Sequence, residues 1–168
     1  MHHRRVRLLR LPLVVALAVA ALGCDAGRPQ IPRSGLPDPI QAVQAGSLER
    51  LFDGRSPARP GCRLAESHTR CTWADTADSS RRVQLTFYVD TVRAAQLLAR
   101  ADAQPIELPL ADQAAIVEQP AAVELWAIVG ARGLQVTYEV GSTGDAAAQR
   151  APLLEIAAQA AAGLAGAR

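Results

Sequence analysis

The chain has 168 residues, of which 49% are hydrophobic and only 4% aromatic, and its formal net charge at pH 7 is +2. Its basic residues are all arginine and do not form the clusters that a nucleic-acid-binding surface requires, so we expect no nucleic-acid partner. Lysine and asparagine do not occur in the sequence, and because their codons begin with AA, this composition indicates a genome of high GC content.

The first 23 residues have the pattern of an export signal. Four arginines within residues 1–10 precede an apolar run of 13 residues at 11–23. A helix needs about 20 residues to cross the hydrocarbon core of a bilayer, so this run predicts a signal peptide rather than a membrane span. An ordinary cleaved signal and an uncleaved anchor helix remain as alternatives.

The end of this run, Ala20-Ala21-Leu22-Gly23-Cys24, resembles a bacterial lipobox, in which the cysteine thiol receives diacylglycerol before the signal is cleaved. The resemblance implies a lipoprotein signal peptide at 1–23, lipidation of Cys24 and attachment to the outer face of the cell membrane. Cleavage would leave 14 arginines against 16 acidic residues, a net charge of −2.

The chain has three cysteines, and an odd number in an exported protein requires a separate role for one of them. If Cys24 carries the lipid, Cys62 and Cys71 remain as a pair, and a disulfide suits an oxidising compartment. Closing a loop of about ten residues would stabilise the fold by roughly 2.5 to 3 kcal/mol. A metal site is the weaker alternative, because two cysteines and the nearby His68 do not supply four ligands.

Residues 24–45 predict a flexible Pro/Gly-rich tether, because the segment contains prolines and glycines but no helical or strand periodicity. The alternative is a loop packed on the domain. A single α+β domain is expected over residues 46–168, beginning with a short helix at 47–52.

The expected fold is a mostly antiparallel sheet with helices packed on one face and one disulfide. Strict alternation of apolar and polar residues predicts strands at 82–89, 123–129 and 134–140, the last two forming a hairpin through Gly130 to Gly133. Shorter strands are expected at 62–64, 70–73 and 115–118. Helical spacing predicts a helix from about 91 to 101, with an apolar stripe on Val92, Ala95, Leu98 and Ala99, and a C-terminal helix with Leu153, Ile156, Ala160 and Leu164.

The motif Cys62…Cys71-Thr72-Trp73, followed by a strand, a helix, a hairpin and an alanine-rich closing helix, is similar to a large group of small actinobacterial lipoproteins of unknown function. The resemblance implies a domain displayed in the cell envelope.

Nothing in the sequence predicts an enzyme, a cofactor or a metal site. His68 follows Glu66 and Ser67, but adjacent turn residues rarely provide the geometry of a catalytic triad, so we interpret His68 as a solvated turn histidine. Asp75 and Asp78 lack the regular oxygen ligands of a calcium loop and predict a polar hairpin turn.

Trp73, Tyr88 and Trp126 are the candidates for a binding surface, because large aromatic side chains dominate interface energetics. The alternative is that the tryptophans are core residues. Two functions are therefore expected: a non-enzymatic interaction module that binds an envelope protein or wall component, or a carrier or sensor that binds a lipid or other apolar small molecule.

Overall fold

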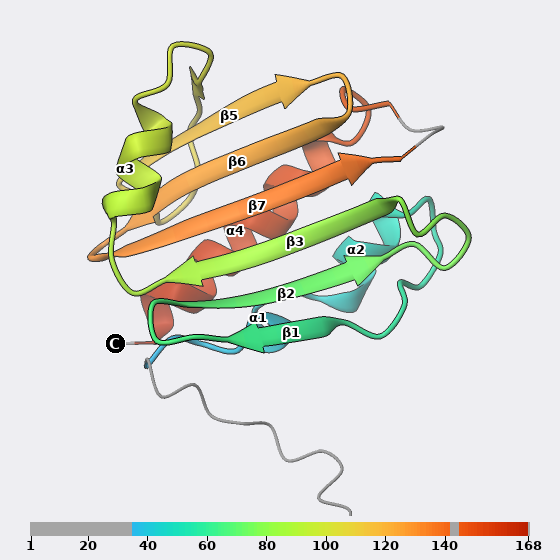
Figure 1. Ribbon diagram of the computed structural model, residues 1–168, viewed down its shortest axis with the longest axis horizontal. Coiled ribbons are helices and arrows are strands. Elements are labelled where there is room, and N and C mark those ends of the chain that lie inside the picture. The colour runs from blue at the N-terminus through green and yellow to red at the C-terminus, as the bar shows by residue number, and fades with distance from the viewer. Residues whose placement is uncertain (1–34, 142–144, 168) are drawn as a thin grey trace, which may run out of the picture. The chain divides into compact units, whose positions relative to one another are not determined.

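The computed structural model describes residues 35–141 and 145–167, so the expected signal peptide, Cys24 and the first part of the tether lie outside the described residues. The described chain forms a seven-stranded antiparallel sheet with four helices (Figure 1). The expected α+β class is confirmed. The strands are β1 (Gly61–Leu64), β2 (His68–Ala74), β3 (Arg81–Tyr88), β4 (Gln104–Pro105), β5 (Gln113–Gln119), β6 (Ala122–Val129) and β7 (Arg132–Val140), and the helices are α1 (Pro39–Ala42), α2 (Ala45–Leu51), α3 (Val92–Leu98) and α4 (Arg150–Gly166).

The sheet has the strand order β1-β2-β3-β7-β6-β5-β4 and consists of two meanders that meet where β3 pairs with β7. Val136 of β7 lies opposite Leu85 of β3 on one side and opposite Leu125 of β6 on the other. The predicted hairpin is present as β6 and β7. Its two-residue loop begins at Gly130, whose φ of +60° is the positive value that such tight connections require.

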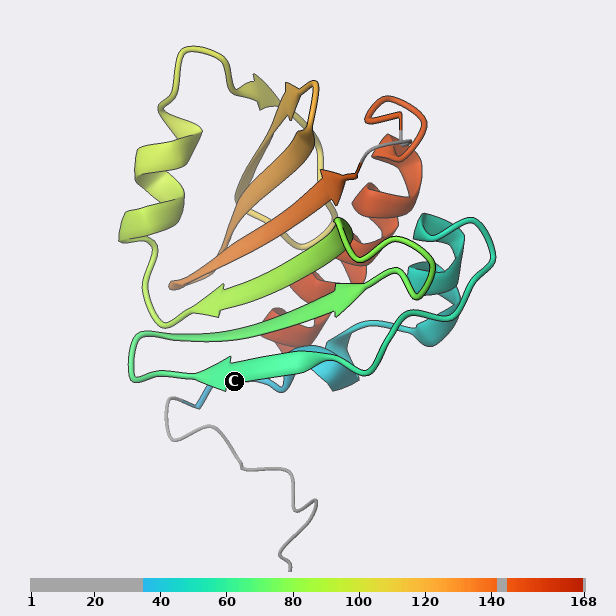
Figure 2. The same cartoon turned by 45° about the vertical axis from the view of Figure 1, so that its right-hand side comes forward.

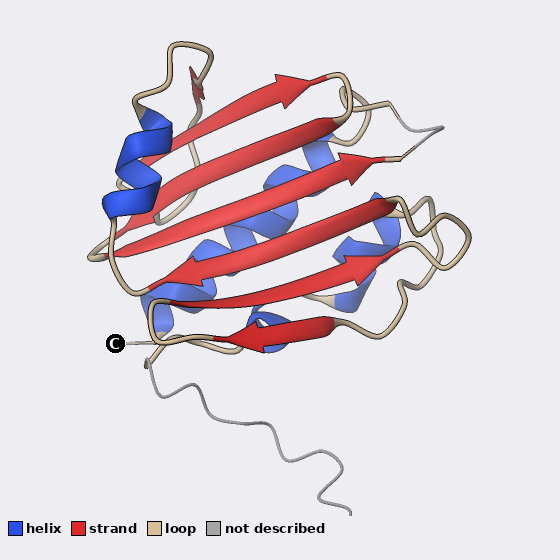
Figure 3. Ribbon diagram, viewed as in Figure 1, coloured by secondary structure: helices blue, strands red, loops and turns tan. Residues whose placement is uncertain are grey.

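The helices lie on both faces of the sheet (Figures 1, 2 and 3). Helices α1, α2 and α4 are together on one face, which we call the helix face, and α4 contacts β6 and β7 there. Helix α3 lies on the opposite face, which we call the open face, and contacts β6 and β7 at one end of the sheet. The placement of α3 differs from the expected position of all helices on one face.

The core lies between the helix face and α4, as the alternation predicted. Leu134, Val136 and Tyr138 of β7 are completely buried, whereas Gln135 and Thr137 between them point to the other face and are only half-buried. All four residues of the predicted stripe on α4 are buried: Leu153, Ile156, Ala160 and Leu164. Each such leucine or isoleucine contributes roughly 1.5–3 kcal/mol by leaving water.

The buried side of α3 is not the predicted stripe. Ala94 is its one buried residue, while Val92 is 60% exposed. The reason lies in β7: a Cβ on Gly133 would stand 3.4 Å from the Cβ of Ala94 and 2.9 Å from the carbonyl oxygen of Asp90. Two small residues, Gly133 and Ala94, therefore allow α3 to approach β7 closely. The spacing of apolar residues along the helix did not predict this contact.

The predicted boundary between tether and domain at residue 45 is corrected by the structure. Leu36, Pro39 and Val43 are buried in the domain, and the Asp38 side chain accepts a hydrogen bond from the Ile40 amide at the start of α1. The backbone amide of Gln44 donates to Gln159 of α4 at 2.9 Å. At least residues 36–45 are therefore part of the fold, because they cover apolar surface that the sheet and α4 leave open.

The predicted disulfide is confirmed: Cys62 and Cys71 lie opposite each other on β1 and β2 and are bonded. Within residues 35–141 and 145–167, none of the helices has the length and apolar character needed to cross a membrane.

Candidate functional site

The three aromatic candidates do not form one surface. Trp73 points to the helix face and is 4% exposed, whereas Tyr88 and Trp126 lie on the open face. Trp126 is 3% exposed because α3 packs over this end of the sheet. The predicted single binding surface is therefore corrected to two separate environments, and Trp126 is a buried residue.

On the open face, Tyr88 and Trp126 form an aromatic stack across β7. Their ring centroids are 6.0 Å apart with an interplanar angle of 25°. Tyr88 lies opposite Gly133, which has no side chain to separate the two rings. The Tyr88 hydroxyl donates to Gln135 at 2.9 Å, and Trp126 Nε1 donates to Glu124 at 3.3 Å, so both polar ends are satisfied. The stack is a second, smaller core under α3.

His68 of β2 lies opposite Tyr88 and extends the aromatic stack to this neighbouring strand. Its ring centroid lies 5.9 Å from that of Tyr88, and its Nδ1 is 3.2 Å from the Ser67 hydroxyl. Partial burial and the nearby positive charge of Arg70 lower the pKa of His68. His68 is thus the first residue of β2 and packs against an aromatic ring, which corrects the expected solvated turn histidine.

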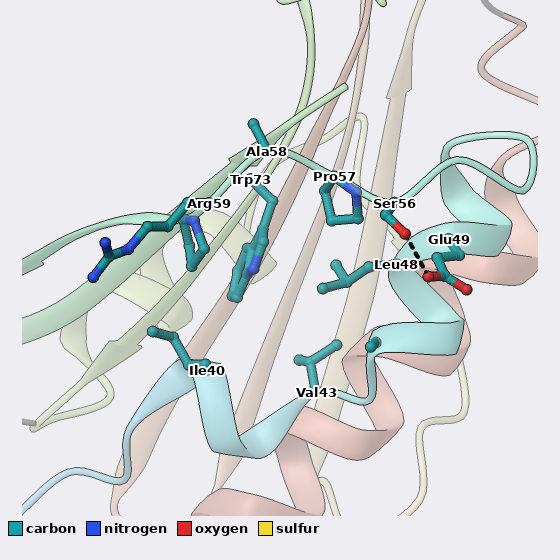
Figure 4. Close-up of a pocket in the computed structure, with 11 residues that line it drawn as sticks. Ile40, Val43, Leu48, Glu49, Ser56, Pro57, Ala58, Arg59 and Trp73 are labelled. Atoms are coloured by element: carbon teal, nitrogen blue, oxygen red, sulfur yellow. Dashed lines mark hydrogen bonds between the residues drawn. The ribbon is translucent and has the colours of Figure 1, made fainter. Parts of the chain in front are cut away.

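Trp73 forms one wall of a pocket on the helix side of the domain (Figure 4). The pocket has a volume of about 300 Å³ and lies between the α1–α2 segment, the loop at 56–60 and Trp73. Its wall is mostly apolar, with Val43 and Leu48 facing the tryptophan and Ile40, which is 46% exposed, at the mouth. This volume is at the lower end of the range for small-molecule sites.

Hydrogen bonds hold the loop wall of this pocket in place. The backbone amide of Ala58 donates to the Ala74 carbonyl at 2.8 Å, which aligns the loop with the end of β2. The Ser56 hydroxyl donates to Glu49 of α2 at 2.7 Å and closes one end of the pocket (Figure 4). The walls are therefore largely preformed.

The helical wall is fixed to α4 by a second polar cluster. Glu155 of α4 accepts hydrogen bonds from Ser47 and Arg50 of α2, and these donors lower the pKa of Glu155, Arg50 making the larger contribution. Gln159 donates to the Ser47 hydroxyl at 2.8 Å. Helix α2 is thus held against α4 by side-chain hydrogen bonds at Ser47, which is itself buried.

An ionic cluster, which no pattern in the sequence predicted, ties the end of α2 to the end of the sheet; Asp75 and Arg81 of this cluster are buried, whereas Asp53 and Arg55 are partly exposed. Asp75 is 2% exposed and accepts hydrogen bonds from Arg55 at 2.6 and 3.2 Å, which lower the pKa of its carboxyl group. Arg81 pairs with Asp53 at 2.7 Å and donates to the Tyr138 hydroxyl at 3.2 Å. The Asp75 carboxylate also accepts a hydrogen bond from the Ala77 amide at 2.8 Å, so it stabilises the turn after β2 as well as the ion pairs.

No group of three or more histidine, cysteine or acidic residues able to hold a metal ion is found among the described residues. The chain matches no protein-family model, no curated protein and no solved structure in three comparisons.

Proposed function

We propose that the protein is a lipid-anchored lipoprotein on the outer face of the cell membrane, whose folded domain is a non-enzymatic interaction module for an envelope protein or wall component. The proposal includes the signal peptide at 1–23, lipidation of Cys24 and membership in the group of small actinobacterial lipoproteins that the sequence resembles.

The Cys62–Cys71 disulfide is the observation that carries this proposal. It accounts for two of three cysteines and leaves Cys24, at the end of the lipobox-like segment, as the remaining one. Disulfides persist in oxidising compartments, so the pair supports export. The domain begins at least by Leu36, and roughly a dozen residues then separate it from Cys24, enough for about 40 Å when extended.

The anchor is tested by Cys24→Ala in cells that supply labelled palmitate. We expect the wild-type chain to incorporate the label and remain with the membrane, and the variant to lose both properties. Cys62→Ser with Cys71→Ser is the matched control, because it removes two thiols and leaves the lipobox-like segment unchanged. Equal labelling of wild type and Cys24→Ala would contradict the proposal.

The pocket beside Trp73 favours a second candidate function, that of a carrier or sensor for a lipid or other apolar small molecule. Its preformed walls are lined by Ile40, Val43, Leu48 and Trp73, and such an apolar lining is typical of a site for an apolar ligand. Mass spectrometry of organic extracts from purified protein tests this function. A co-purifying amphiphile that is lost in Leu48→Glu, a change in the pocket wall, and kept in Val92→Glu, on exposed α3, would support the carrier. If the extracts contain no such molecule, the carrier function is contradicted and the interaction module remains as the proposed function.

A further inference from the structure

The uncovered part of the open face contains a depression between β1, β2 and β3. Its volume is about 340 Å³, and Arg63, Arg70, Thr72 and Gln84 line it. The depression exists because Gly61 lies opposite Thr72 and has no side chain to fill the space. Arg63 lies directly opposite Arg70 in the same pair of strands.

This arginine pair differs from most other arginines of the domain. Six arginines form ion pairs with carboxylates, namely Arg50, Arg55, Arg81, Arg82, Arg100 and Arg150. Arg63 and Arg70 have no carboxylate partner in the described part of the chain. Like charges directly opposite each other destabilise an antiparallel pair, so this arrangement costs stability unless an anion lies between them.

We propose that this depression binds a phosphate group, held between the guanidinium groups of Arg63 and Arg70. Arg70 Nε donates to the Thr86 hydroxyl at 3.3 Å, which fixes the base of its guanidinium and leaves the terminal N–H groups for a ligand. Planar guanidinium groups match the oxygens of phosphate in a two-pronged geometry. Gln84 donates to the Thr72 hydroxyl at 3.3 Å, so the floor of the site is also ordered.

The site is separate from the apolar pocket and does not depend on the proposed lipid anchor. Trp73, which lines the pocket, points to the helix face, whereas Thr72 and Arg70 point to the open face. The phosphate group has two sources, inorganic phosphate or the headgroup of an anionic phospholipid, and the experiment distinguishes them.

His68 is a reporter next to this site, because it senses the charge of Arg70. Its other polar neighbours are Ser67, whose hydroxyl lies 3.2 Å from Nδ1, and Tyr88, which lies opposite it on β3. Glu66 stands two residues earlier in the chain. A bound anion favours the charged imidazole, so it raises the pKa of His68. In the full chain, NMR titration of the assigned His68 signal should show an upward shift of about 0.3 pH unit or more with inorganic phosphate, compared with chloride at equal ionic strength.

Two variants test the location of the site. Gly61→Val fills the depression, and because a Cβ at Gly61 meets no atom within 4 Å, the fold should be retained. Arg63→Gln combined with Arg70→Gln removes both cations. In either variant the phosphate-induced shift of His68 should disappear, while thermal melting shows a folded domain. Arg93→Gln, which removes an exposed arginine on α3, should keep the shift.

The lipid source is tested with Cys24→Ala protein, in which the anchor cannot contribute, and vesicles of phosphatidylglycerol or of phosphatidylcholine. Headgroup binding predicts association with the phosphatidylglycerol vesicles alone, weakened roughly fivefold for each arginine removed. Phosphate-dependent shifts without vesicle binding would assign the site to soluble phosphate. A His68 signal that does not respond to phosphate, or a response that persists in Gly61→Val and in the double arginine variant, would overturn the proposal.

Discussion

The two faces of the sheet are built by alternate residues of the same strands, yet they have different kinds of interior. On the helix face, Val136 and its neighbours form a continuous apolar layer under α4. On the open face, α3 covers Trp126 at one end of the sheet, and Thr86, Ala115 and Val117 are also buried. The rest of this face on β2, β3 and β7 consists mainly of polar, partly exposed residues. The comparison shows that strand alternation determines which side a residue faces, whereas the covering element determines whether that side is buried.

The largest expected effect is on the helix face. Val136→Asp places an uncompensated charge in the layer between β7 and α4, where Val136 is completely buried. We expect a loss of roughly 5 kcal/mol or more, which is enough to unfold the domain, visible as loss of the cooperative thermal transition by circular dichroism. The control is Thr137→Ala on the open face, which should change stability by less than about 0.5 kcal/mol. Equal sensitivity at both positions would mean that the strand's facing is misassigned.

Trp126→Ala tests whether the small open-face core contributes to stability. Removal of a buried tryptophan should cost about 3–5 kcal/mol, measured by denaturant unfolding, because α3 cannot fill the space left next to Tyr88. Trp126→Phe retains the aromatic stack and should cost much less. If Trp126→Ala left stability unchanged, the residue would have to be part of an exposed binding surface instead.

Asp75→Asn tests the ionic cluster that ties the end of α2 to the end of the sheet. Loss of this buried carboxylate leaves Arg81 with fewer partners and should cost roughly 3 kcal/mol at neutral pH. Since hydrogen bonding from Arg55 lowers the folded-state pKa of Asp75 below its ordinary value of 3.8, its stabilisation is complete above that value and is lost as the pH falls below it. Unfolding free energies of wild type and variant should therefore converge in acid. Asp102→Asn, at an exposed pair with Arg100, is the control and should change little.

Gly133→Ala is the smallest of these changes and probes how closely α3 approaches β7. The new Cβ would lie 2.9 Å from the Asp90 carbonyl oxygen, so the helix must move, and we expect a cost of about 1–3 kcal/mol in denaturant unfolding. Gly61→Ala places the same methyl group in open space and should leave stability nearly unchanged. A neutral effect at Gly133 would show that α3 is loosely attached.

The sequence predicted the parts of the fold that depend on local periodicity. Alternation located β3, β6 and β7, and helical spacing identified the buried side of α4 through residues such as Ile156. The buried side of α3 was not predictable in this way, because its contact depends on the pairing of Ala94 with Gly133, two small residues far apart in the chain.

The candidate site was less predictable than the fold. Trp73 was identified as an aromatic candidate, but its pocket also requires α1. The prolines within residues 36–45 indicated a tether, so this helix was not predicted. The ionic cluster brings together Asp53, Asp75 and Arg81 from three segments, and no spacing rule connects them. The arginine pair followed from the register of β1 and β2, which only the structure provides.

The junction of β3 and β7 also has a consequence for how the chain acquires its fold. Each meander forms from neighbouring strands, but 43 residues separate the end of β3 from the start of β7. Pairing between distant segments is slow because loop closure precedes the gain in contacts. Until β7 has been synthesised, β3 therefore has an unpaired backbone edge, which is the part of an incomplete sheet most open to association with other chains.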